Sequence, residues 1–286
     1  MSKKLLTQLL LITAGVFVAL IIYFAPDQHS EDSTKLEDTL QEHDHEVDAQ
    51  GNDDMEVSDP LEDIDPSDRD HILQLEAKLA SEISVNDKLS LYDSIITFSI
   101  QKNIPPLVAK YTEEKANTLP SENNWLLAGD NYFKAFRLSK GQSKEMLLGA
   151  VRNYERSLEL NPENLKAQTS LGVAYVEGAS ILGEMPMKGI GMLLEVVNKD
   201  PKNVDALTNL GYFAIQSGQY EKAIERFNAV LEIDPDNAEA FIYLTDTYLS
   251  QGEREKGIET LEKYKALVDD PLVIQQVDAY IEELMK

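Results

Sequence analysis

The sequence predicts an all-α protein, a solenoid of stacked helix-turn-helix units preceded by a transmembrane helix and a disordered acidic linker. The first observation is the stretch 204–237, in which apolar residues recur at helical spacing on either side of a turn. The second is a short turn sequence that occurs three times in nearly the same form. The third is an uncharged apolar segment, 5–24, followed by a long acidic stretch with few apolar residues.

Residues 204–237 form the clearest unit. A turn at Ser217-Gly218-Gln219 separates two predicted helices, and Pro235 ends the second one. Asn237 is placed to cap the helix that follows. Small residues, Gly211 and Ala223, fall where the two helices should approach closely. The apolar helical positions are Leu207, Leu210, Gly211, Ala214, Ala223, Phe227, Val230 and Leu231.

Similar turns separate this unit from its neighbours. They are Asn161-Pro162-Glu163-Asn164, Asp200-Pro201-Lys202-Asn203 and Asp234-Pro235-Asp236-Asn237. Upstream, the pattern W-x-x-L-G-x-x-Y is matched, with alanine in place of leucine, by Trp125, Ala128, Gly129 and Tyr132. These features resemble the tetratricopeptide repeat (TPR) family, whose unit is a helix pair of about 34 residues. The resemblance implies a superhelix whose first helices line a concave groove for peptides or partner helices.

The predicted organisation follows from the repeats. A cytoplasmic tail (1–4), the transmembrane helix (5–24) and the linker (25–66) lead to a lead-in helix (67–88). The TPR domain (89–271) comprises a degenerate repeat (89–121) and four better ones (122–164, 165–203, 204–237 and 238–271), and a capping helix (272–286) covers the last. Two repeats are longer than the family unit, one through an insertion around Gly141 and the other through an insertion between Glu177 and Pro186. Both insertions are expected to project from one edge of the stack.

The N-terminal segment is interpreted as a membrane anchor. As a helix, residues 5–24 would span about 30 Å, the thickness of a bilayer core. The alternative is a cleaved signal peptide, which needs a shorter apolar region and a small-x-small cleavage site. Here the segment ends in Tyr23-Phe24-Ala25-Pro26, which favours an uncleaved anchor. Lys3 and Lys4 predict a single pass through the inner membrane, with the N-terminus cytoplasmic and the TPR domain periplasmic.

The linker region is dominated by negative charge. Residues 27–68 contain 17 acidic side chains and one basic side chain, Lys35. Such a stretch buries too little apolar surface to offset the entropy of ordering, so disorder is predicted. Three histidines lie in it, His29, His43 and His45, but their spacing is not that of ligands fixed by a fold. No metal site is predicted.

The family resemblance also implies which residues line the groove. Carrying its first-helix positions across gives Leu126, Asp130, Phe133, Thr169, Val173, Val176, Thr208, Tyr212, Ile215, Gln216, Ile242, Asp246 and Leu249. For each apolar residue of this set, the alternative is that its side chain packs in the core and does not line the groove. Phe133 and Tyr212 are the expected aromatic anchors for a protein or peptide partner. Chaperone-binding family members hold a C-terminal carboxylate with lysine, arginine and asparagine, and Asn209 alone does not make such a clamp.

Composition argues against other classes of function. The net charge of −25 over 286 residues disfavours nucleic acid as a partner. The absence of cysteine removes disulfides and thiolate chemistry. His71 is the only histidine beyond the linker, so no Ser-His-Asp arrangement is expected around the repeats, and no phosphate-binding loop is present. We therefore expect no enzyme, no cofactor and no small-molecule substrate.

Two functions fit this organisation. One is a membrane-tethered scaffold that mediates protein–protein interactions in the bacterial cell envelope. In layout the chain resembles the single-pass ancillary TPR proteins of the secretion translocon. The other is a chaperone-like subunit of a periplasmic assembly system such as cytochrome c maturation, whose TPR region the stretch 200–220 resembles. The sequence does not choose between them, because a fold alone does not define a function.

Overall fold

The computed structural model describes residue 61 and residues 64–286. This part of the chain contains thirteen α-helices and no β-strand, which confirms the all-α class. The predicted cytoplasmic tail, the transmembrane helix and most of the linker lie outside the described residues. The described helices belong to one compact unit, Ser58–Lys286. None of them combines the length and apolar character that a membrane span requires.

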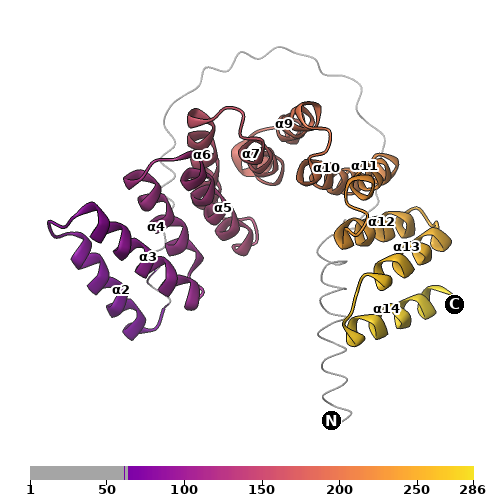
Figure 1. Ribbon diagram of the computed structural model, residues 1–286, viewed down its shortest axis with the longest axis horizontal. Helices are drawn as coiled ribbons and strands as arrows, with labels where there is room; N and C mark the ends of the chain where they lie inside the picture. The colour runs from indigo at the N-terminus through magenta and orange to yellow at the C-terminus, as the bar shows by residue number, and fades with distance from the viewer. Residues whose placement is uncertain (1–60, 62–63) are drawn as a thin grey trace, which may run out of the picture. The chain divides into compact units, whose positions relative to one another are not determined.

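The helices follow one another in chain order, from indigo to yellow in Figure 1. Their bounds are α2 (Pro66–Leu79), α3 (Val85–Gln101), α4 (Pro105–Thr118), α5 (Glu122–Leu138), α6 (Lys144–Leu160), α7 (Leu165–Glu177), α8 (Ala179–Leu182), α9 (Pro186–Lys199), α10 (Val204–Gln216), α11 (Tyr220–Ile233), α12 (Ala238–Ser250), α13 (Arg254–Ala266) and α14 (Pro271–Leu284).

Polar caps fix where the helices after the repeated turns begin. Asn164, Asn203 and Asn237 each accept a hydrogen bond at Oδ1 from the backbone N–H three residues further on, at 3.0, 2.9 and 2.9 Å. Each bond satisfies one N–H that the first turn of a helix leaves without a partner. Each preceding helix ends two residues before the proline of the same turn. The cap predicted at Asn237 is confirmed, and it recurs at the two equivalent turns.

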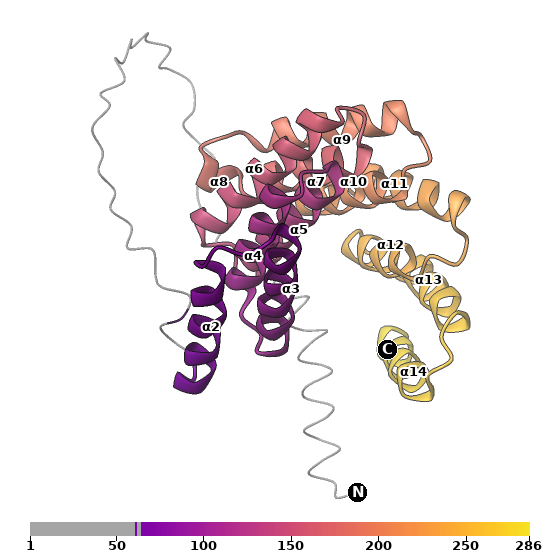
Figure 2. The ribbon, with the colours of Figure 1, turned by 60° about the vertical axis from the view of Figure 1, so that its left-hand side comes forward.

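The helices pack as pairs, and the pairs stack. α3 packs on α4, α5 on α6, α7 on α9, α10 on α11, and α12 on α13. The second helix of a pair then packs on the first helix of the next pair, as α6 does on α7 and α11 on α12. First helices also meet in a row, α5 with α7, α7 with α10 and α10 with α12, and α7 and α10 lie side by side in Figure 2. We call these four helices the first-helix layer.

Glycine lets the two helices of a pair approach closely. A Cβ atom on Gly211 would lie 2.7 Å from Cζ of Phe227, so the phenyl ring occupies the space that a side chain would need. The predicted close approach at Gly211 is therefore confirmed, with Phe227 as its partner, and Ala223 is fully buried. In α7 and α9 the contact is between backbones, because a Cβ on Gly189 would collide with the carbonyl oxygen of Gly172.

The α5/α6 pair uses aromatic rings on both helices instead. A Cβ on Gly129 of α5 would lie 2.5 Å from Cδ1 of Tyr154, a residue of α6. Reciprocally, the ring of Tyr132 on α5 fills the space in front of Gly149 on α6. Tyr154 is 1% exposed, so its ring is a fixed part of this interface.

The two insertions are folded mostly as helix, and their projection from one edge of the stack stays a prediction. The first insertion lengthens α5 and α6 to 17 residues each, against 13 and 14 residues in α10 and α11. The added helical turns bury apolar side chains such as Phe136 and Met146, and this burial favours helix over loop. The second insertion folds as the short helix α8, which ends at Gly183 in the left-handed conformation with φ of 67°.

The core consists of successive clusters along the stack. The largest joins α4, α5, α6, α7, α9 and α10, and a second one joins α2, α3 and α4. This second cluster includes Leu61, whose side chain is 7% exposed, and Ile64 packs against the cluster. Both residues fall in the predicted linker, most of which lies outside the described residues, so its disorder stays a prediction. Their apolar side chains gain more from burial beside α2 and α3 than they lose in ordering.

Candidate functional site

Side chains of the first-helix layer reach from one repeat to the next. Arg137 of α5 forms an ion pair with Glu177 of α7, and the ring centroids of Tyr212 on α10 and Tyr243 on α12 are 5.8 Å apart. Burial and the charge of Glu177 raise the pKa of Tyr212 above its ordinary value, while the charge of Arg137 opposes this shift. Groups from four repeats therefore share one surface, which we call the first-helix face.

Arg137 is held between a carboxylate and an aromatic ring. Its Nε donates to Oε2 of Glu177 at 3.0 Å, and a second guanidinium nitrogen donates to Oε1. The guanidinium carbon lies 4.6 Å from the centroid of the Phe133 ring. A bidentate ion pair with a carboxylate, together with a cation–π contact, restrains an arginine side chain strongly. The first-helix face thus contains one cation site that its own arginine already occupies.

Asp130 lies on the same helix as Arg137 and is tied to the core. Tyr154 donates from its hydroxyl group to Oδ1 of Asp130 at 3.0 Å. Burial raises the pKa of Asp130, while hydrogen bonds from Tyr154 and Ser170 and the charge of Lys166 oppose the shift. The Asp130 carboxylate is therefore engaged in the fold and not available as an isolated charge.

Asp246 on α12 has a different environment. Burial alone raises its pKa to about 6, and no lysine or arginine of the described residues counteracts this rise. Burial raises the pKa of Tyr243 to about 12, with further contributions from Glu239 and Asp246. Burial and then the charge of Asp246 also raise the pKa of Tyr280 on α14. Burial is therefore the largest cause of the raised pKa in all three groups, Asp246, Tyr243 and Tyr280.

Tyr212, Asp246 and Tyr280 occupy one register position in successive units. The step from 212 to 246 equals the step from 246 to 280, and each matches the length of one repeat. α14 packs on α13 through Val277 and Ile281, as a helix covering the last repeat should. By register α14 takes the position of the first helix of a further repeat.

The structure distributes the thirteen predicted groove residues over three environments. Four are buried, Leu126, Phe133, Thr169 and Val173. Eight are half-buried, Asp130, Val176, Thr208, Tyr212, Ile215, Ile242, Asp246 and Leu249, and Gln216 is exposed. Phe133 belongs to the largest core cluster, and its ring stacks on Phe136 at 5.7 Å. The burial of Phe133 favours the alternative interpretation, in which this side chain packs in the core and does not bind a partner.

Sequence reasoning missed four residues of this surface, Arg137, Glu177, Tyr243 and Tyr280. A usable signal existed for Arg137, which follows Phe133 by four positions just as Gln216 follows Tyr212. Residues at this spacing lie on one helix face, and Gln216 does contact Tyr212, donating from Nε2 to the phenol oxygen at 2.9 Å. A step of one repeat from Asp246 would have identified Tyr280.

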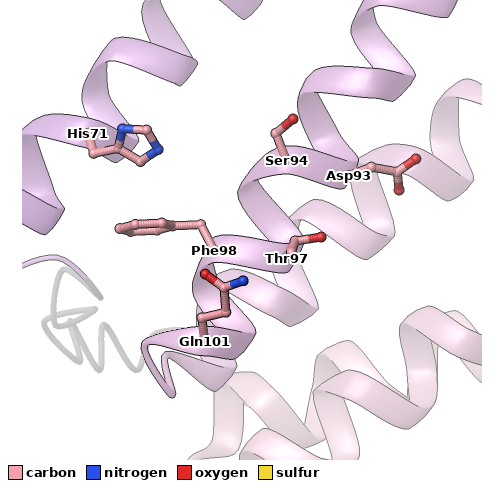
Figure 3. Close-up of a pocket in the computed structure, with 6 residues that line it drawn as sticks. All are labelled: His71, Asp93, Ser94, Thr97, Phe98 and Gln101. Carbon is pink, nitrogen blue, oxygen red and sulfur yellow. The ribbon is translucent and has the colours of Figure 1, made fainter.

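A second feature is a shallow hollow of about 410 Å³ beside α2 and α3. Figure 3 shows the imidazole of His71 next to the ring of Phe98, with centroids 4.5 Å apart, while Ser94 and Asp93 point away from it. The Ser94 hydroxyl donates to the Ser90 carbonyl at 2.8 Å, and Asp93 pairs with Lys115. The hollow brings a histidine, a serine and an aspartate together without the bonding pattern of a catalytic triad.

The described helices offer no cluster of metal ligands. Within residues 61 and 64–286, no group of three histidine, cysteine, aspartate or glutamate side chains is arranged to hold a metal ion. The three linker histidines, His29, His43 and His45, lie outside the described residues.

The stacked helix pairs and the row of first helices define an α-solenoid with an extended lateral face. Two tetratricopeptide-repeat family models match the sequence, one over residues 192–225 and the other over residues 214–275. Residues 192–275 of the chain are therefore tetratricopeptide repeats. No curated protein matches its sequence.

Several solved structures are similar to the chain. The MamA RS-1 ArsTM double mutant has 18% identity and a TM-score of 0.47, covering 64% of this chain and 96% of that one. MamA 41-end from Desulfovibrio magneticus RS-1 has 19% identity and a TM-score of 0.47, covering 64% and 97%. YrrB, described as a TPR protein with an unusual peptide-binding site, has 22% identity and a TM-score of 0.43, covering 66% and 91%.

Proposed function

We propose that this protein is a membrane-tethered TPR scaffold that mediates protein–protein interactions in the bacterial cell envelope. TPR units serve as interaction modules because their stacking creates long surfaces made from equivalent residues of successive repeats. The observation that carries the proposal is the first-helix face. Its side chains come from different repeats, contact one another and stay partly open to solvent.

The aromatic residues of this face supply anchors for a partner segment. Tyr212 and Tyr243 are half-buried, and each presents an apolar ring with a polar hydroxyl group. Such rings contribute much of the binding energy in protein interfaces at a low entropic cost. Phe133 is only 7% exposed and offers little surface to a partner, so we assign the second anchor to Tyr243 instead. A helical or extended segment lying along α10 and α12 would contact both tyrosines.

The membrane tether and the envelope location rest on the sequence. The uncharged residues 5–24 have the length of a bilayer span, and Lys3 and Lys4 precede them. A reporter fused after Lys286 should therefore be active only if it functions outside the cytoplasm. Activity of a reporter restricted to the cytoplasm would overturn this part of the proposal, as would a mature N-terminus at Ala25 or beyond.

Site-specific crosslinking tests the interaction face in the full-length protein. A photoreactive residue at Gln216, which is exposed on α10, should capture a protein partner in membranes. The matched control is the same residue at Glu225, which is exposed on α11 and lies outside the first-helix layer. Capture only from position 216 supports the proposal. Capture only from position 225 places the interaction on the second helices and contradicts it.

Substitution then measures the anchor. Tyr212→Ala should weaken capture by roughly ten- to a hundredfold, equivalent to about 1–3 kcal/mol, because a half-buried ring is lost from the interface. Tyr220→Ala removes a tyrosine from the start of α11 and serves as the control. Equal capture by both folded variants would show that Tyr212 is not an anchor.

A further inference from the structure

Two tyrosines of the first-helix face form a fixed aromatic pair. The rings of Tyr212 on α10 and Tyr243 on α12 have centroids 5.8 Å apart and are tilted by 52°. The Tyr243 ring stacks on that of Phe227 at 5.1 Å, and Phe227 is fully buried. The Tyr212 ring lies 5.5 Å from that of Phe213, which is also buried. Because a buried phenylalanine backs each half-buried tyrosine, the pair has little freedom to rearrange.

The same face carries exposed hydrogen-bond donors. Nε2 of Gln216 donates to the hydroxyl oxygen of Tyr212 at 2.9 Å, and Gln216 is itself exposed. Arg137 bonds to Glu177 through Nε and one terminal nitrogen, and its other terminal nitrogen makes no hydrogen bond among the described residues. The Arg137 side chain is 52% exposed. A matching occupant of this face therefore offers hydrogen-bond acceptors as well as apolar surface.

Charges of both signs act on the aromatic pair. Burial is the largest cause of the raised pKa of both tyrosines, and the positive charge of Arg137 opposes the rise in each of them. Negative charge reinforces the rise, from Glu177 at Tyr212 and from Glu239 at Tyr243. Arg137 would repel a basic side chain placed on the rings, and the two glutamates would repel an acidic one. This balance favours an uncharged occupant.

The donors distinguish an extended segment from a helix. The main-chain carbonyl groups of an α-helix are already bonded within the helix, so Arg137 and Gln216 would gain no acceptor from them. A polyproline II segment has no internal hydrogen bonds, and its carbonyl groups stay open to donors. Its residues return to the same side every third position, about 9 Å along the axis, which is close to the roughly 8–10 Å between packed helices. Such a segment keeps one side toward successive first helices as it crosses their row.

We propose that the first-helix face binds an uncharged, proline-rich segment of a partner protein, with proline rings packed on Tyr212 and Tyr243 and a main-chain carbonyl group bonded to Arg137. The inference rests on the proposed scaffold function and names the class of partner. A proline ring is apolar, and its backbone angle is fixed before binding, so little entropy is lost when the segment is ordered. Aromatic-lined surfaces recognise proline-rich segments in other folds for the same reason.

Two fluorescent peptides test the proposal on the full-length protein in detergent. One is decaproline, and the other is an uncharged peptide of the same length that forms a helix from leucine, alanine and glutamine. Decaproline should bind with an affinity that changes little as salt is added, and the helical peptide should bind roughly tenfold more weakly. Equal binding of both peptides, tighter binding of the helical one, or binding of neither overturns the proposal.

Ring substitutions locate the binding surface. Tyr212→Leu and Tyr243→Leu keep an apolar side chain and remove the aromatic ring, so each should weaken decaproline binding about tenfold. Tyr220→Leu, at the start of α11, is the control and should leave the affinity unchanged. Circular dichroism checks that each variant is folded. Equal affinities of the three variants would overturn the assignment to the tyrosine pair.

A second pair of variants leaves the aromatic pair intact. Arg137→Lys keeps the positive charge and removes the planar guanidinium, so it should weaken decaproline binding roughly threefold. Arg156→Lys is the matched control, because the Arg156 guanidinium also covers a ring, that of Trp125 at 4.8 Å, but belongs to the second helix α6. Equal effects of the two substitutions would overturn the carbonyl contact assigned to Arg137.

Competition in the crosslinking test separates this inference from the scaffold function. If position 216 captures a partner and decaproline does not reduce that capture, the scaffold stands and the proline-rich partner fails. If position 216 captures nothing and position 225 does, the scaffold face itself is wrong. Capture of a second copy of this chain at position 216 would overturn the assignment to a partner protein. The failures therefore give different patterns.

Discussion

The helix pairs α5/α6 and α7/α9 belong to adjacent repeats and bring two helices together in opposite ways. In α5/α6 tyrosine rings separate the backbones, with Tyr154 against Gly129 and Tyr132 against Gly149. In α7/α9 the backbones touch where glycines face each other. The α5/α6 pair absorbed its insertion by lengthening both helices, whereas the α7/α9 pair placed its insertion outside the contact, in α8. A backbone contact cannot shift as a side chain can, so an added methyl group should disturb α7/α9 more than α5/α6.

The largest effect should come from the glycine contact. Gly189→Ala places a Cβ against the Gly172 carbonyl oxygen and 2.7 Å from Cγ2 of Val176. Backbone cannot rotate away as a side chain can, so α7 and α9 must separate. The free energy of unfolding should fall by about 3 kcal/mol. Urea titration followed by circular dichroism measures it, and a loss below that of the next substitution would reverse the comparison.

Gly129→Ala is the matched change in the pair spaced by rings. The added Cβ would lie 2.5 Å from Cδ1 of Tyr154, and that ring is 1% exposed. The ring can shift slightly, although the surrounding core limits it. The expected loss is about 2 kcal/mol in the same urea titration. If Gly129→Ala is neutral, the ring has more freedom than its burial suggests.

Tyr154→Phe keeps the ring and removes only the hydroxyl that donates to Asp130. The expected loss at neutral pH is about 1 kcal/mol, because a hydrogen bond to a carboxylate is lost. The bond favours the ionised carboxylate, so its removal raises the pKa of Asp130 further. The loss should therefore be larger at neutral pH than in acid, where Asp130 is protonated in both proteins. Titrations at the two pH values test this, and an equal loss at both would contradict the assigned bond.

Gly191→Ala is the smallest change and has the opposite sign. Gly191 lies in α9, two residues after Gly189, and a Cβ there would meet nothing within 4 Å. Alanine favours a helix over glycine by about 0.5–1 kcal/mol, so the variant should be more stable by that amount. It also serves as the control for Gly189→Ala, because both add one methyl group to the same helix. A destabilised Gly191→Ala would show that α9 tolerates no added methyl.

The helix pairs were predictable because their causes are local. Proline, asparagine and glycine mark each turn of the later repeats, and the buried positions follow the helical period, with only Leu231 of the positions chosen in residues 204–237 left half-buried. The insertion in α5/α6 was misjudged because Ser139, Gly141 and Ser143 are typical loop residues. The structure uses them in a short turn and adds helix on both sides of it.

The interaction face was less predictable, because its contacts depend on how far one helix extends past the next. The Arg137–Glu177 ion pair joins the last turn of the lengthened α5 to the last residue of α7. Phe133 has the same register as Ile215, which is half-buried, yet the added turn carries Phe136, whose ring stacks on that of Phe133. Asp246 is half-buried on α12, and no local pattern in the sequence predicts that degree of burial.

The asparagine caps have a consequence for how such a chain changes length over generations. Asn203 and Asn237 bond the equivalent backbone atom of the helix that follows each of them, and they lie one repeat apart in the sequence. Excising residues 204–237 would join Asn203 to Ala238, and the cap of α12 would be remade by the asparagine that now caps α10. Duplicating the same stretch would likewise leave every junction intact. Each of these turns is therefore a natural crossover point for recombination, at which the reach of the molecule can be shortened or extended by one whole repeat.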